Sequence, residues 1–179
     1  MGKLDGKIAL VTGAASGLGE ASARLMATEG ATVVLADINR EAGARVADEI
    51  GGAAEFAPLD VTSEAAWEGV ISGIVARHGG LNVLVNNAGV VVSATIEDTS
   101  LEQLNFVRAV NFDGPFLGCK HAIPAMAASG GGSIVNISSA ASIVGTPAYA
   151  AYSCTKGAVR SLTQTVAVHC KQRGTKVRC

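Results

Sequence analysis

The stretch IALVTGAASGLG, residues 8–19, decides the fold. Its first four residues are apolar on consecutive positions, which predicts a strand covered on both faces, as in a parallel sheet between two layers of helices. Three glycines follow at GxxxGxG spacing, which differs from the commoner GxGxxG pattern. Glycine tolerates positive φ and has no Cβ, so a phosphate could approach the free N–H groups of the helix that begins here. We expect a strand, a phosphate-binding turn and a helix, with close packing of helix against strand as the alternative reason for Gly19.

The rest of the chain repeats this alternation of strand and helix. Further strand-like runs lie at residues 32–36, 54–57, 83–85 and 133–137, and helical patterns lie at about 17–30, 40–51, 63–79, 100–129 and 149–173. Ser100 followed by Gln103 predicts a capping box, and Gly30, Gly51 and Gly79 stand where helices should end. The alternation predicts a Rossmann-type doubly wound α/β fold, a parallel sheet flanked by helices, with ligands bound at the carboxyl ends of the strands.

Length and composition predict one domain, residues 1–179. The chain is 49% apolar and 16% charged, with 14 basic and 15 acidic residues, which argues against a disordered chain and a charge-driven nucleic-acid binder. The start lacks the apolar region of a signal peptide, and prolines, glycines and Asn136 interrupt the uncharged stretch 122–155, so we expect a buried strand there and no membrane span. Four unevenly spaced cysteines predict neither a metal site nor a disulfide framework, and favour a reducing, cytoplasmic location.

Asp37 closes the second predicted strand, about 20 residues beyond the glycines, where an acidic side chain can accept hydrogen bonds from the adenosine ribose. The same carboxylate would repel a 2′-phosphate. Because Ile38 follows it and no arginine occupies the glycine turn, the site favours NAD over NADP, and Arg40 is the one residue that could weaken this preference. The alternative is that Asp37 only caps the next helix.

Tyr152 and Lys156 are four residues apart on a predicted helix and therefore share one face. An ammonium about 6 Å from a phenol, at an effective dielectric near 20, would lower the pKa of the phenol by about two units from its usual value near 10. Tyr152 could then act as a general acid or base near neutral pH. On its own such a pair is frequent by chance, and a solvated helical pair is the alternative.

Taken together, these motifs resemble the short-chain dehydrogenase/reductase family over essentially the whole chain. The resemblance rests on Thr12-Gly13-x-x-x-Gly17-x-Gly19, Asn86-Asn87-Ala88-Gly89, Asn111, Ser139 thirteen residues before Tyr152, and Tyr152-x-x-x-Lys156. It implies an oxidoreductase that transfers a hydride between NAD(H) and a secondary alcohol or ketone, with alicyclic and steroid alcohols as candidates. It also implies a homotetramer or homodimer with no nucleic-acid or membrane partner.

The same resemblance assigns roles to individual residues. Tyr152 would exchange the hydroxyl proton, and Ser139 would hydrogen-bond the substrate oxygen, with Ser138 as the competing choice. Lys156 would lower the pKa of Tyr152 and bind the nicotinamide ribose, and Asn111 would hold a water that links Lys156 to solvent. The implied cofactor contacts are Gly13, Ser16, Gly17, Leu18, Gly19, Asp37, Asp60, Val61, Asn87, Gly89, Tyr152 and Lys156.

Family members are usually longer, so we expect the C-terminal strands and the lid over the substrate to be missing, and the 179-residue chain alone to turn over little. Two alternatives stay open. One is a catalytically incompetent fragment that acts only as a nucleotide-binding or subunit-interaction module. The other is an NADP-dependent 3-oxoacyl reductase.

For three histidines and one cysteine, the sequence predicts no functional role. His78, His121 and His169 show no acidic or cysteine partner in the sequence, so packing or surface positions are expected. Cys154, between Tyr152 and Lys156, is expected to be inert and packed, with chemical accessibility from the cleft as the alternative.

Overall fold

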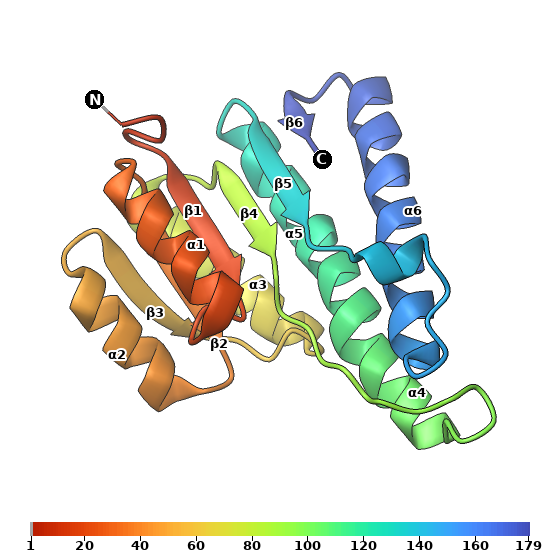
Figure 1. The fold of residues 1–179 in the computed structure, drawn as a ribbon. Helices are drawn as coiled ribbons and strands as arrows, with labels where there is room; N and C mark the ends of the chain where they lie inside the picture. Colours follow the sequence, from red (N-terminus) through yellow and green to blue (C-terminus); the bar gives the residue numbers. More distant parts are fainter. Residues whose placement is uncertain (1) are drawn as a thin grey trace.

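The computed structural model describes residues 2–179, which form one six-stranded parallel sheet in the order β3-β2-β1-β4-β5-β6 (Figure 1). The strands are β1 Ile8–Thr12, β2 Thr32–Asp37, β3 Ala54–Pro58, β4 Val83–Asn86, β5 Gly132–Asn136 and β6 Val177–Arg178. The order reverses direction between β1 and β4, as in a doubly wound sheet. The Rossmann-type fold expected from the sequence is therefore confirmed.

Helices cover both faces of the sheet. They are α1 Gly17–Thr28, α2 Arg40–Ile50, α3 Glu64–His78, α4 Leu101–Arg108, α5 Gly114–Ala128 and α6 Ala150–Gln172. Within β1, Leu10 belongs to a core shared with α3, α5 and α6, while Ala9 and Val11 belong to a second core shared with α1 and α2. The consecutive apolar residues of β1 are therefore explained, because each face of the strand is buried under its own layer of helices.

The helical stretch expected over residues 100–129 is formed, but it contains a π-helical segment. A π-helical segment, Ala109–Asp113, separates α4 from α5, and the N–H of Gly114 donates to the carbonyl of Ala109. Pro115 has no N–H and cannot supply the donor that an α-helix would offer to the carbonyl of Asn111. The helical stretch expected over 100–129 is therefore present, and Pro115 is the sequence signal that marks its π-helical part.

The predicted helix boundaries agree with the structure elsewhere. Ser100 and Gln103 form the capping box at the start of α4. Gly51 and Gly79 are the C-caps of α2 and α3, and Gly79 has a left-handed φ of 78°. Across residues 2–179, none of the helices combines the length and the apolar character that crossing a membrane would require.

Candidate active site

The glycine turn between β1 and α1 uses each of its glycines differently. Gly13 and Gly17 have φ angles of 64° and 56°, which disfavour any residue with a Cβ. A Cβ on Gly19 would lie 2.1 Å from the carbonyl oxygen of Gly13, whereas a Cβ on Gly17 would have no atom of the described residues within 4 Å. Close packing therefore explains Gly19, and only Gly17 presents open space beside the backbone.

This open space belongs to a cavity of about 460 Å³ at the carboxyl ends of β1 to β4. Nine residues expected to contact a cofactor line it, namely Gly13, Ser16, Gly17, Leu18, Asp37, Asp60, Val61, Asn87 and Gly89. Sequence reasoning assigned no binding role to six others, which are Ile38, Leu59, Ala88, Val90, Phe106 and Val110. The residues predicted from four separate strand ends therefore meet around one cavity, while Gly19 lies outside its lining.

Asp37 connects the glycine turn to the end of β2. Its Oδ2 accepts a hydrogen bond from the N–H of Ala15 at 3.0 Å, and its Oδ1 accepts one from the N–H of Asn39 at 2.9 Å. The cap of α2 is Asn39, whose side chain accepts from the N–H of Ala42. The alternative that Asp37 serves as the cap of this helix is therefore wrong, and its carboxylate instead borders the cavity.

Thr12 and Asn87 hold the far wall of the cavity to the glycine turn. The hydroxyl oxygen of Thr12 accepts from the N–H groups of Asn87 and Ala88 at 3.0 and 3.1 Å. The side-chain amide of Asn87 donates to the carbonyls of Thr12 and Gly13 at 2.9 and 3.2 Å. These bonds fix the loop after β4 against the end of β1.

Tyr152 and Lys156 share a face of α6, as their spacing predicts. The Nζ of Lys156 lies 5.7 Å from the centroid of the Tyr152 ring and donates to the carbonyl of Ile137 at 2.7 Å. Lys156 is only 4% exposed, and this burial lowers the pKa of its ammonium group. The alternative interpretation, a solvated helical pair, is therefore wrong, because Lys156 is a buried cation beside a tyrosine ring.

Gly89 joins this pair to the cavity. A Cβ on Gly89 would lie 3.5 Å from the Nζ of Lys156 and 3.3 Å from the Oδ1 of Asn111. Asn111 is fully buried, and its side chain exchanges two 2.8 Å hydrogen bonds with the backbone of Val90. The π-helical segment therefore places Asn111 where it holds the loop after Gly89 next to Lys156.

The two neighbouring serines have different surroundings. The hydroxyl of Ser138 donates to the carbonyl of Lys156 at 2.9 Å, which ties the end of β5 to α6. The hydroxyl oxygen of Ser139 accepts from the N–H of Ala141 at 3.2 Å, and within residues 2–179 its own hydrogen has no acceptor. Ser139 therefore keeps a free donor, in line with the choice made from its spacing.

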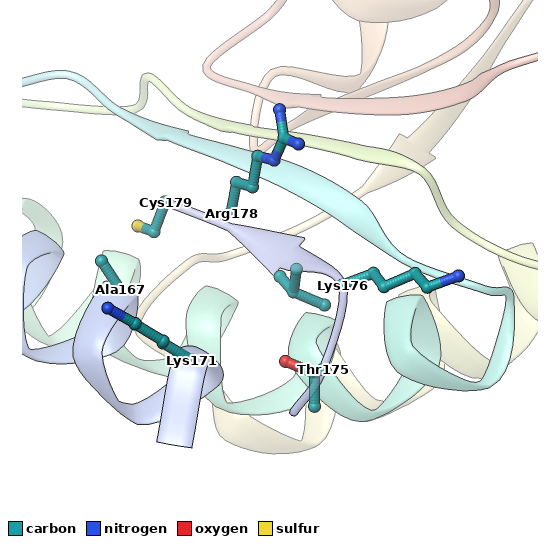
Figure 2. A pocket seen from close by; sticks show the side chains of 7 residues that line it. Ala167, Lys171, Thr175, Lys176, Arg178 and Cys179 are labelled. Carbon is teal, nitrogen blue, oxygen red and sulfur yellow. The ribbon is translucent and has the colours of Figure 1, made fainter. Parts of the chain in front are cut away.

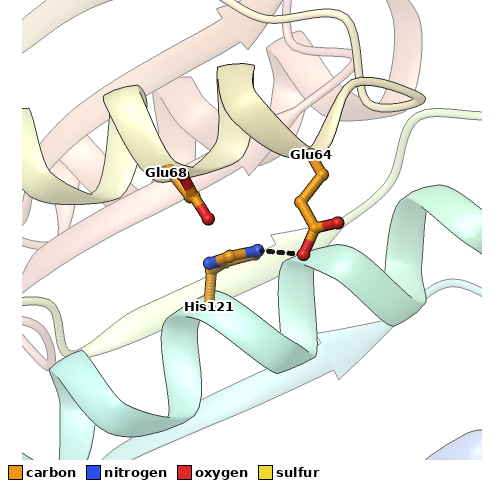
Figure 3. Close-up of side chains that lie close together, drawn as sticks. All are labelled: Glu64, Glu68 and His121. Atoms are coloured by element: carbon orange, nitrogen blue, oxygen red, sulfur yellow. Dashed lines mark hydrogen bonds and ion pairs between the residues drawn. The ribbon is translucent and has the colours of Figure 1, made fainter.

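Two of the three histidines do have acidic partners, which corrects the expectation. The Nε2 of His78 lies 3.2 Å from Glu55, and that of His121 lies 3.3 Å from Glu64. Figure 3 shows His121 with Glu64 and Glu68, three groups close enough to ligate one ion. The ammonium of Lys120 also binds the same Glu64 oxygen, so this exposed cluster is an ion-pair network on α3 and α5.

A second hollow and the cysteines lie apart from the active-site cavity. The hollow, about 620 Å³ in volume, lies between α6 and β6, where Lys171, Thr175 and Cys179 line it (Figure 2). Cys154 is exposed, so the expectation that it is packed was wrong. Cys119 is buried, and a hydrogen bond with Cys179 together with burial raises the pKa of its thiol.

Comparison with known proteins connects this geometry to a family. A family model described as short chain dehydrogenase matches residues 7–179. The 3-alpha-(or 20-beta)-hydroxysteroid dehydrogenase of Mycobacterium tuberculosis is 44% identical over 176 residues, which cover 98% of this chain and 68% of that protein. The cyclopentanol dehydrogenase of Comamonas sp. is 43% identical over 171 residues, which cover 94% of this chain and 68% of that protein.

A solved structure gives the same answer. The crystal structure of a short chain dehydrogenase/reductase from Burkholderia phymatum in complex with NAD matches with a TM-score of 0.95 at 32% sequence identity. The match covers 100% of this chain and 65% of that chain, so the chain spans about two thirds of the length of such proteins. The chain belongs to the short-chain dehydrogenase family.

Proposed function

We propose that the chain carries the cofactor-binding and catalytic parts of an NAD-dependent dehydrogenase that interconverts a secondary alcohol and a ketone. The observation that carries the proposal is the buried ammonium of Lys156 beside Tyr152, adjoining a glycine-lined cavity. Alicyclic and steroid alcohols are the candidate substrates, because related proteins are named as dehydrogenases of cyclopentanol and of hydroxysteroids.

The cavity has the features that NAD requires. Open space beside Gly17 lets a pyrophosphate approach the N-terminus of α1, where N–H groups are free. Asp37 and Asp60 line the cavity with carboxylates that can accept bonds from ribose and adenine, and among residues 2–179 no lysine or arginine lines it. A 2′-phosphate would face the charge of Asp37 without a cation, which favours NAD over NADP. Bound NAD supplies the acceptor for the hydride.

Tyr152 is the group that moves the proton. The nearby ammonium of Lys156 stabilises a phenolate electrostatically, and a phenolate can accept the proton of the substrate hydroxyl. This ammonium donates one of its three hydrogens in a hydrogen bond to the carbonyl of Ile137, so the others can be donated to the nicotinamide ribose. Lys156 thus serves both the proton transfer and the position of the cofactor.

Ser139 and Asn111 complete the site. The free hydroxyl hydrogen of Ser139 can be donated to the substrate oxygen, while Ser138 is engaged in holding α6. The backbone carbonyl of Asn111 cannot receive an N–H from Pro115, so it is a candidate to hold a water. We further propose that the full-length protein works in the cytoplasm as a homodimer or homotetramer.

The proposal is tested by assaying the full-length protein with NAD or NADP against cyclopentanol and a 3-hydroxysteroid. We expect NADH formation with at least one alcohol and a clear preference for NAD. Tyr152→Phe should lower the turnover about 10²- to 10⁴-fold, because it removes the proton acceptor, and should weaken NADH binding far less, because the ring is kept. A Tyr152→Phe enzyme with wild-type turnover would refute the assigned mechanism.

A further inference from the structure

Phe106 lines the cavity although nothing in the sequence motifs points to it. It lies in α4, is 52% exposed, and is the single aromatic residue in the cavity lining as described over residues 2–179. Its sequence neighbour Val107 is fully buried, and the capping box at Ser100 fixes the start of the helix. The ring is therefore presented by an anchored helix.

The helical run shows which end of the cavity this ring faces. Phe106, Val110 and Gly114 follow one another at intervals of four and so lie along one side of the run. A Cβ on Gly114 would lie 3.0 Å from the Cγ2 of Val61, so this side is turned toward the residue next to Asp60. Val110 and Phe106 continue that side along the cavity wall.

We propose that the ring of Phe106 packs against the adenine base of the bound dinucleotide and sets the affinity of the cleft for its adenosine half. The inference rests on the proposed function, because it takes the cavity to be the NAD site. Asp37 and Asp60, at the ends of β2 and β3, mark the adenosine end of the cavity, whereas Tyr152 and Lys156 lie outside its lining. A purine has a flat π face, and an aromatic side chain is the surface in this lining that can match it.

The test measures the dissociation constants of ADP-ribose and NADH for the wild-type chain and for Phe106→Ala. ADP-ribose keeps adenine and lacks nicotinamide, so both ligands should lose affinity by the same factor, roughly 5- to 30-fold for one lost base–aromatic contact. Phe106→Leu should lose nearly as much, because it keeps apolar volume without the ring.

Phe116→Ala is the matched control, since Phe116 is also a half-exposed phenylalanine, 49% exposed, and lies outside the cavity lining. It should bind both ligands as the wild type does, and thermal unfolding should show all three variants folded.

Unchanged ADP-ribose binding by Phe106→Ala, wild-type affinity in Phe106→Leu, or a loss confined to NADH would each overturn the inference. A wild-type chain that binds neither ligand would instead refute the proposed function, so the two failures are distinguishable.

Discussion

The glycine turn lines the cavity and the start of α6 lies beside it, and the two regions are built by opposite means. The turn presents its backbone to the cavity, and its glycines leave room there because they have no side chains, as the open space at Gly17 shows. Helix α6 instead buries a charged side chain, Lys156, whose Nζ lies 5.7 Å from the centre of the Tyr152 ring. We therefore expect the glycine turn to lose stability or cofactor binding when a substitution adds atoms. We expect the start of α6 to lose activity when a substitution removes atoms or changes a charge.

The largest effect on stability is expected where an added atom meets backbone. Gly19→Ala should lower the free energy of unfolding by about 1–3 kcal/mol, because its Cβ would lie 2.1 Å from the Gly13 carbonyl oxygen and the turn must shift. Gly17→Ala should lower the free energy of unfolding by only about 1–2 kcal/mol, because the φ of 56° at this position is left-handed. Its main effect should be weaker NADH binding.

Urea unfolding and NADH titration of both variants check this contrast. If Gly17→Ala bound NADH like the wild type, the open space at Gly17 would not be part of the cofactor site.

Asp37→Asn should change cofactor choice with little change in stability. It removes the charge that opposes a 2′-phosphate and keeps one oxygen for the N–H of Ala15, while the exposed N–H of Asn39 loses its acceptor. We expect the ratio of NAD to NADP affinities to fall by about tenfold, which corresponds to about 1.4 kcal/mol. Titration with the two reduced cofactors measures this ratio, and an unchanged ratio would count against a ribose role for Asp37.

The smallest effect is a pH dependence that comes from Lys156. Burial lowers its pKa in the folded protein, so between that value and the ordinary value of 10.5 the unfolded chain binds more protons than the folded one. The contribution of Lys156 to the free energy of unfolding must therefore rise as pH increases through this window.

Urea unfolding of the wild type and Lys156→Met from pH 7 to pH 10.5 isolates this contribution, because the other titrating groups are shared. The wild type should gain stability relative to the variant as pH rises. A difference that stays constant across the window would contradict the burial of a charged lysine.

The sequence predicted the parts of the molecule that local patterns encode. The consecutive apolar residues of β1 predict burial on both faces, and Ser100 with Gln103 predicts the start of α4. The shared face of Tyr152 and Lys156 follows from helical spacing, whereas their roles follow only from the resemblance. In each case the physical cause acts within a few residues, so the pattern is visible without the fold.

Features that depend on contacts between distant segments were missed. Phe106 lines the cavity only because the π-helical segment and α5 dock beside Val61. The partner of His121 lies on another helix, 57 residues away in the chain, and spacing gives no sign of it. The π-helical segment around Asn111 has a local sequence signal in Pro115. This signal is informative only when the helix is already expected to continue through residue 115.

The central claim is that one cleft binds NAD and places it against Tyr152 and Lys156. The most direct measurement is a fluorescence titration of the 179-residue chain with NADH, carried out on the wild type, Gly17→Ala and Tyr152→Phe. The account predicts saturable binding by the wild type and clearly weaker binding by Gly17→Ala, with a smaller loss in Tyr152→Phe, which keeps the ring and loses only the hydroxyl. Absence of saturable binding by a folded wild-type chain would contradict it.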